Sequence, residues 1–160
     1  MNDIPSHANE MRQNLVTGQW VIYALSRRKR PREIVETRHA PEEQPAYDVS
    51  CPFCPGNEEM LPRVILEIKG LDLPWQARIA ANKYPVLTPG GDLKRTKRGI
   101  YTAMDGYGHH EVIIENPLHN RHFPTMTSQE AEVVIECYHR RYTELMEMEM
   151  SIGSSGSDRG

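Results

Sequence analysis

The order of the periodic segments limits the fold most: short strand-like runs come first, and one long helical segment follows them. The helical segment opens at residues 127–130, Thr-Ser-Gln-Glu, which fits a capping box: the Thr and Glu side chains each accept a hydrogen bond from a backbone amide. Apolar residues then recur at helical spacing, and the opposite face is charged. These apolar positions are Ala131, Ile135, Tyr138, Tyr142 and Leu145. The pattern predicts a helix that lies on a sheet.

Four strand-like regions precede this helix. They are a hairpin over residues 14–23 that turns at Thr17-Gly18, and single strands over residues 63–69, 77–81 and 110–115. Strands followed by one helix are typical of an α+β domain built on an antiparallel sheet with a surface helix. We therefore expect one α+β domain.

Composition suggests the limits of this domain, which we place at residues 14–147. Residues 1–13 are polar and predict a flexible N-terminal arm. Residues 148–160 end in a Gly/Ser-rich stretch with little apolar surface, which predicts a disordered tail. The Gly-, Lys- and Arg-rich residues 89–99 predict an exposed excursion.

Size and charge exclude several classes of function. The chain has 160 residues and a net charge of −3, which fits one domain and argues against a nucleic-acid coat or a polybasic membrane anchor. No apolar run approaches the roughly 18 residues of a membrane span, and the N-terminus lacks the apolar stretch of a secretory signal. Three cysteines, two of them closely spaced, argue against a disulfide framework. We expect a cytoplasmic protein without nucleic-acid or membrane partners.

Cys51-Pro-Phe-Cys54 is the motif with the most specific chemistry. Two thiolates at this spacing in a turn can bind one tetrahedral zinc ion, but they supply only half of its ligands. A redox pair or two inert core thiols remain alternatives, although a redox pair would favour a helix start behind it. Cys137 lies off the apolar stripe of the helix and is interpreted as passive.

Other candidates have ordinary structural interpretations when each is taken alone. The basic run of residues 27–32 could clamp phosphate through its guanidinium groups or could be a solvated loop. Asn82, at the end of a strand, could bind a base or ribose or could simply form a turn. Each histidine, including His109, His110 and His122, is by default a surface or hydrogen-bonded residue.

Five motifs follow one another along the chain: Arg12-x-Asn-x-x-Thr-Gly-x-Trp-Val-Ile22, Arg27-x-Lys-Arg-Pro31, Cys51-Pro-Phe-Cys-x-Gly-Asn57, Asn82-Lys-Tyr-Pro85 and Gly108-x-His-Glu-Val-Ile-Ile-Glu-x-Pro-x-His119. In this order they resemble the galactose-1-phosphate uridylyltransferase family. Members of this family contain two histidine-triad-like domains, and the chain resembles the first. The resemblance implies a half-barrel fold, here truncated at its C-terminal end.

The resemblance also implies a substrate, a metal and site residues. Zinc would be held by Cys51, Cys54 and His119. The family transfers a uridylyl group between UDP-glucose and galactose 1-phosphate through a uridylyl-histidine, and its members form homodimers. The residues on substrate-binding positions are Arg27 and Arg30, which would reach the phosphates, and Asn82 and Lys83, which would bind the nucleoside.

One departure from the family pattern concerns catalysis. The nucleophile of the family lies in a His-Pro-His motif, and these 160 residues contain no His-x-His sequence. We therefore assign no catalytic residue and expect the chain alone to be inactive, with a zinc site completed by water or His122. The alternatives are an ADP-sugar or dinucleoside-polyphosphate enzyme of the same superfamily, or a non-catalytic zinc-stabilised nucleotide-binding module.

Overall fold

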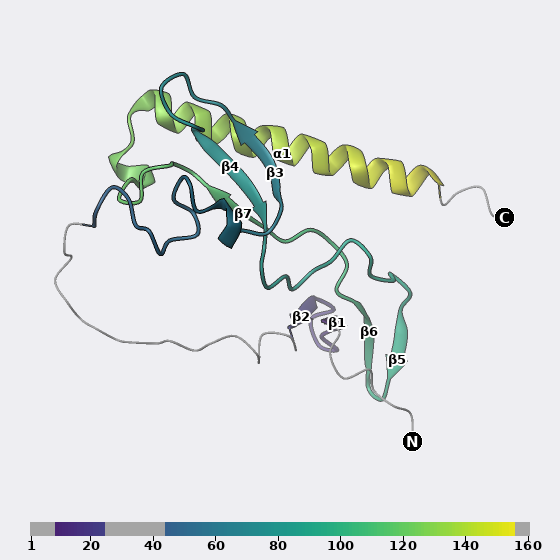
Figure 1. The fold of residues 1–160 in the computed structure, drawn as a ribbon. Helices are drawn as coiled ribbons and strands as arrows, with labels where there is room; N and C mark the ends of the chain where they lie inside the picture. The colour runs from purple at the N-terminus through teal and green to yellow at the C-terminus, as the bar shows by residue number, and fades with distance from the viewer. Residues whose placement is uncertain (1–8, 25–43, 156–160) are drawn as a thin grey trace. The chain divides into compact units, whose positions relative to one another are not determined.

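The computed structural model describes residues 9–24 and 44–155, with side chains as far as residue 149. Seven strands and one α-helix lie in this described part, together with short 3-10 helices at Glu58–Met60 and Phe123–Thr125 (Figure 1). The strands are β1 (Glu10–Gln13), β2 (Trp20–Tyr23), β3 (Val64–Ile68), β4 (Ala77–Ala81), β5 (Thr96–Arg98), β6 (Tyr101–Asp105) and β7 (Glu111–Ile114), and the helix is α1 (Ser128–Ser155). The expected α+β class is confirmed.

The chain forms two compact units, where the sequence predicted one domain with one sheet. Residues 1–39 and 81–111 make up the first unit, and residues 40–80 and 112–160 make up the second. The first unit contains a four-stranded sheet of order β2-β1-β6-β5, and the second contains a three-stranded sheet of order β3-β4-β7. The second unit is therefore interrupted, between β4 and β7, by a long excursion of the chain into the first.

The expected flexible arm contains a strand. Residues 10–13 form β1, which pairs antiparallel with both β2 and β6. The hairpin turns at Gly18, whose φ of 72° suits glycine, and Oδ1 of Asn14 accepts hydrogen bonds from the backbone amides of Val16 and Thr17. The first strand therefore precedes Asn14, and exposed Leu15 and Val16, which the sequence placed in a strand, belong to the turn.

The predicted exposed excursion at residues 89–99 ends in the first strand of a second hairpin. Its last residues form β5, which is fully exposed, and β5 pairs antiparallel with β6 after a turn at Gly99. Strand β6 was not predicted from the sequence, because apolar and polar residues alternate only weakly in it and Ala103 is its one buried residue.

The core of the second unit lies on both faces of β4. Side chains of a strand alternate between its faces, so Ala77 and Ile79 pack in one cluster with Leu66 of β3 and Cys137 of α1. Ala80 packs on the other face with Trp75 and Ile114 of β7. The helix therefore covers one face of the sheet, as expected, and runs alongside β3 and β4 in Figure 1.

The capping box is confirmed, but the helix is longer than expected. The Glu130 carboxylate accepts from the Thr127 amide at 2.7 Å, and the Thr127 hydroxyl accepts from the Glu130 amide at 3.2 Å. The helix continues to Ser155, past the boundary that we expected at residue 147. Its last turns are rich in Glu and Met, which are good helix formers.

The buried face of the helix differs from the predicted stripe. Val134 and Cys137 are fully buried, whereas Ile135 and Tyr142, both in the predicted stripe, are exposed. The interpretation of Cys137 as a residue off the packed face is therefore wrong.

No helix in the described residues is long and apolar enough to cross a membrane.

Candidate metal centre and associated residues

The Cys51–Cys54 segment is a compact loop made of successive tight turns. The Cys51 amide donates to the Asp48 carbonyl at 3.2 Å, the Cys54 amide to the Cys51 carbonyl at 3.3 Å, and the Asn57 amide to the Cys54 carbonyl at 3.2 Å. Gly56 permits the last turn with a φ of 90°. These turns bring the two cysteine side chains to one side of the loop.

Asn57 holds this loop together from inside. Its side-chain amide is almost fully buried and donates to the carbonyl of Cys51 at 2.7 Å and to that of Asp48 at 3.1 Å. Its carbonyl oxygen accepts from the Tyr47 hydroxyl at 3.2 Å. Asn57 is the last residue of the Cys51–Asn57 motif, and its role in the loop could not be predicted from the sequence.

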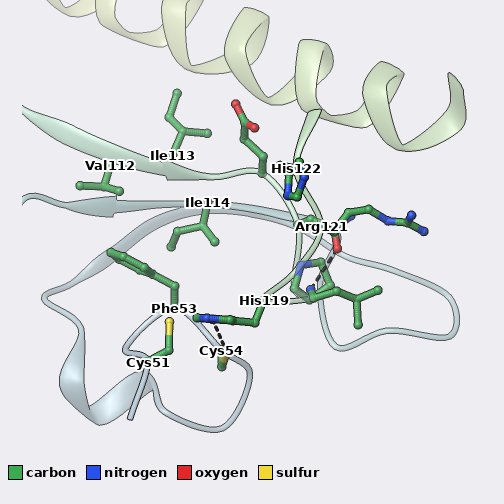
Figure 2. A pocket seen from close by; sticks show the side chains of 13 residues that line it. Cys51, Phe53, Cys54, Val112, Ile113, Ile114, His119, Arg121 and His122 are labelled. Carbon is green, nitrogen blue, oxygen red and sulfur yellow. Dashed lines mark hydrogen bonds between the residues drawn. The ribbon is translucent and has the colours of Figure 1, made fainter. Parts of the chain in front are cut away.

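His119 comes to this loop from the segment after β7. Its backbone amide donates to the Ala46 carbonyl at 2.8 Å, which ties the two segments together. Its Nδ1 lies 3.5 Å from Cys54 Sγ. One ligand atom from each of Cys51, Cys54 and His119 lies within 4.8 Å of the others, and Figure 2 shows their side chains converging.

This donor set fits zinc. Zinc binds sulfur at about 2.3 Å and nitrogen at about 2.0 Å, so a sulfur ligand and a nitrogen ligand of one tetrahedral site lie roughly 3.5 Å apart. The Cys54–His119 separation of 3.5 Å matches that spacing. Thiolate sulfur and imidazole nitrogen are the usual ligands of zinc, whereas Mg²⁺ and Ca²⁺ prefer oxygen ligands. Among the described residues, these three are the group placed to hold a metal, and His122 is not one of them.

The electrostatics of the loop suit a bound cation. Burial raises the pKa of the Cys54 thiol, so a nearby cation is needed to favour its thiolate at neutral pH. The backbone amide of Asp48 donates to Cys54 Sγ at 3.4 Å. Hydrogen bonds from the hydroxyl and amide of Ser50 lower the pKa of Asp48, so its carboxylate adds negative charge nearby. The redox alternative lacks its expected support, because a 3-10 helix follows the pair instead of an α-helix start.

A cavity of about 310 Å³ adjoins the metal group. Its walls include Phe53, Ile114, Arg121 and His122, besides the three candidate ligands (Figure 2). The Arg121 guanidinium is held at Nε by Glu130 at 3.2 Å and at Nη1 by the Thr125 carbonyl at 2.9 Å. The cavity therefore has apolar side chains on its wall beside an arginine whose guanidinium is engaged by Glu130.

The residues predicted to bind substrate belong to other parts of the chain. Asn82 follows β4, and its side-chain Oδ1 accepts a hydrogen bond from the Tyr84 backbone amide at 2.8 Å. Lys83 is exposed, with its ammonium 6.0 Å from the centre of the Tyr84 ring. Both residues belong to the first compact unit. Arg27 and Arg30 lie outside the described residues.

Comparison with protein families gives one match over most of the chain. Residues 2–152 match the family described as galactose-1-phosphate uridyl transferase, N-terminal domain. An ADP-glucose phosphorylase of Arabidopsis thaliana is 30% identical over 74% of the chain. A galactose-1-phosphate uridylyltransferase of Haemophilus influenzae is 24% identical over 88% of it, and a probable one of Drosophila melanogaster is 25% identical over 91%. The chain spans only 34% to 40% of the length of these relatives.

Solved structures agree on the fold. A uridylyltransferase structure matches 84% of the chain with a TM-score of 0.53 at 21% identity, and the chain covers 34% of it. An Arabidopsis thaliana ADP-glucose phosphorylase, solved with bound ADP-glucose, matches 88% of the chain with a TM-score of 0.50 at 25% identity, and 39% of that structure is covered.

Proposed function

Because the chain belongs to the galactose-1-phosphate uridyl transferase family, whose N-terminal domain it matches over residues 2–152, we propose that it binds a nucleotide sugar and also holds a structural zinc ion. The reaction that it serves is uridylyl exchange between UDP-glucose and galactose 1-phosphate, in galactose metabolism. The observation that carries the proposal is the convergence of Cys51, Cys54 and His119 within 4.8 Å. This convergence supports zinc binding, one of the roles that the Cys51–Cys54 motif taken alone left open.

Zinc has a structural role in this proposal. Cys51 and Cys54 lie in one loop, and His119 lies in the segment after β7, so a metal bound to all three would cross-link two loops of the second unit. The ion would stabilise the thiolates and hold the loops together. Water or a further side chain would complete the tetrahedron.

The substrate would be held by residues outside the metal group. Arg27 and Arg30 would contact the phosphates through their guanidinium groups, and Asn82 and Lys83 would contact the nucleoside. In the complete reaction, an imidazole nitrogen attacks the α-phosphorus of UDP-glucose. An N–P bond forms, and the bond to the leaving glucose 1-phosphate oxygen breaks. Since these 160 residues contain no His-x-His motif, we propose that the chain alone binds nucleotide without this step.

The adenine nucleotide is the second candidate substrate. The relative at 30% identity is called an ADP-glucose phosphorylase, and a similar structure is described with bound ADP-glucose. The same fold could therefore hold ADP-glucose in this chain. A homodimer rests on the same family resemblance, and a cytoplasmic location rests on composition.

Two measurements on the purified chain test this function. Elemental analysis should find equimolar zinc, and calorimetry should detect binding of UDP-glucose or ADP-glucose, with the tighter ligand deciding between the two candidates. An intact-mass spectrum after incubation with each sugar nucleotide should show no covalent nucleotidyl adduct. Absence of zinc would contradict the metal assignment, and an adduct would show that a histidine of this chain acts as nucleophile.

A further inference from the structure

His110 and the segment after β4 form a hydrogen-bonded unit outside the metal centre. The backbone amide of Asn82 donates to the His110 carbonyl at 3.1 Å. The His110 ring also meets this segment at both nitrogens: Nδ1 accepts from the Val86 amide at 3.0 Å, and Nε2 lies 3.2 Å from Asn82 Nδ2. All three residues belong to the first compact unit.

The Val86 contact assigns the tautomer of His110. A backbone amide can only donate, so Nδ1 must present a lone pair to it. A neutral imidazole with a lone pair on Nδ1 carries its proton on Nε2. The Nε2–H is therefore a donor, and it faces the side chain of Asn82.

The Tyr84 contact assigns the orientation of the Asn82 amide. The Tyr84 backbone amide donates to Oδ1 of Asn82 at 2.8 Å, so Oδ1 is the acceptor on that side and the NH₂ group is the part that faces His110. Reversing the amide would place its NH₂ group against the Tyr84 N–H. Two donors, Asn82 Nδ2 and His110 Nε2, therefore lie side by side 3.2 Å apart.

Two adjacent donors need a shared acceptor. Nitrogens separated by 3.2 Å can both reach one oxygen at the usual hydrogen-bond length of about 2.9 Å. Both side chains are partly exposed, so an oxygen from outside can reach them. In the free protein water can supply this oxygen, and a ligand oxygen that replaces the water meets two donors that are already oriented.

We infer that Asn82 and His110 together bind one acceptor oxygen of the nucleotide, with His110 as the second donor. The inference rests on the proposed nucleotide-binding function and extends it to a residue that the family resemblance left without a role. The oxygen belongs to the base, the ribose or the phosphate. Uracil has carbonyl oxygens and adenine has none, so a contact to the base would favour uridine nucleotides.

The first test examines the free protein. Long-range ¹H–¹⁵N spectra of the ¹⁵N-labelled chain should show His110 as a neutral ring with its proton on Nε2. His110→Ala identifies its signals. A proton on Nδ1 would overturn the inference, whatever the chain binds.

The second test measures binding of UMP, AMP and ribose 5-phosphate by calorimetry. His110→Ala should weaken binding at least tenfold, and His110→Gln, which keeps a donor near the position of Nε2, should recover most of it. His109→Ala is the matched control, because its ring is partly exposed and its Nδ1 lies 3.8 Å from the Glu111 carboxylate. Loss for UMP alone would assign the oxygen to the base, and equal loss for UMP and AMP would assign it to ribose or phosphate, with ribose 5-phosphate as the check.

Two outcomes overturn the inference and differ from each other. If the wild-type chain binds UMP or AMP and His110→Ala binds equally well, the two-donor site is wrong and the proposed function stands. If the wild-type chain binds none of the three probes, nor UDP-glucose or ADP-glucose, the proposed function itself fails. Melting curves of each variant show whether the replaced side chain changed folding instead of binding.

Discussion

Cys54 Sγ and His119 Nδ1 lie 3.5 Å apart, although 65 positions of the chain separate the two residues. Such a contact closes a long loop, and closing it has an entropic cost that local turns do not have. The hydrogen bond from the Asn57 side chain to the Cys51 carbonyl holds the cysteine loop in shape. The hydrogen bond from the His119 amide to the Ala46 carbonyl holds the histidine segment near that loop. A metal ion bound here would therefore join two segments that are already held close to each other.

Removal of zinc should destabilise the chain. Free zinc at about 100 times its Kd stabilises a folded protein by about 2.7 kcal/mol, which corresponds to roughly 5–10 °C in Tm for a chain of this size. A chelator should lower the Tm by that amount in a calorimetric scan. Cys51→Ser should show the same low Tm with and without chelator.

Cys137→Ala is the control for this experiment, because Cys137 is fully buried, packs with Leu66 and Ile79, and does not belong to the metal group. It should lower the Tm by a small cavity effect and keep both its zinc and its response to chelator. Equal zinc content in Cys51→Ser and the wild type would contradict the assignment.

The effect of zinc should depend on pH in a defined direction. Burial raises the pKa of the Cys54 thiol, so the neutral thiol stabilises the metal-free fold below the unfolded pKa, and this contribution is lost as pH rises through the folded pKa. Zinc needs the thiolate, so its affinity rises over the same interval. The difference in Tm between zinc-loaded and zinc-free chain should be larger at mildly alkaline than at mildly acidic pH.

Asn57 should tune the metal site without binding the metal. Asn57→Ala removes the two side-chain donors that hold the loop carbonyls of Cys51 and Asp48, and loss of such supporting bonds typically weakens metal binding about 10–100-fold. Competition titration with a zinc indicator measures this change. Glu59→Ala, at an exposed position next to the same loop, should leave the affinity unchanged.

The metal group was predictable from sequence only in part. The spacing of Cys51 and Cys54 indicates half a site by itself, and His119 was identified through the family resemblance, because a histidine brought in by tertiary folding has no local signature. His110 had no such support, since its role depends on the turn formed by Asn82 and Tyr84. A single sequence shows which residue types are present but not which backbone amides meet a ring.

Secondary structure shows the same division between local and tertiary signals. The capping box at Thr127 and the strand at residues 77–81 depend on local sequence and were predicted correctly. The strand at residues 10–13 was missed because its residues are polar and it is stabilised by pairing with β2 and β6. The sequence of a short polar segment does not show which distant strands will pair with it.

The capping box should contribute measurably to stability. Thr127→Ala removes the hydroxyl that accepts from the Glu130 amide, and such a change typically costs about 1 kcal/mol. A hydrogen bond from the Thr127 amide lowers the pKa of Glu130. The stabilisation from Glu130 is therefore present above its unfolded pKa and is lost as pH falls through the lower folded pKa. Denaturation at several pH values should show a smaller acid-induced loss in Glu130→Gln than in the wild type.

Arg78 and Lys69 test the value of a buried ion pair against an exposed one, because both bond to Glu67. Arg78 is buried, and it also contacts Glu58 at 3.0 Å and stacks 4.5 Å from the Trp75 ring centre. Arg78→Ala should cost about 3 kcal/mol, since it leaves Glu67 without its buried partner. Lys69→Ala should cost less than about 0.5 kcal/mol. Similar losses in urea denaturation would show that burial does not distinguish the pairs.

Two neighbouring residues of α1 test which face of the helix packs on the sheet. The sequence pattern favoured the stripe that contains Ile135, but Ile135 is 56% exposed, whereas Val134 is 0% exposed. The pattern favoured the wrong face because it counted exposed aromatic side chains as apolar positions and did not count Cys137, which packs against Ile79. Val134→Ala should therefore destabilise the chain by about 2 kcal/mol through a cavity, and Ile135→Ala should change stability by less than about 0.5 kcal/mol. Urea denaturation of both variants measures the difference, and a larger loss for Ile135→Ala would show that the predicted stripe is the packed face.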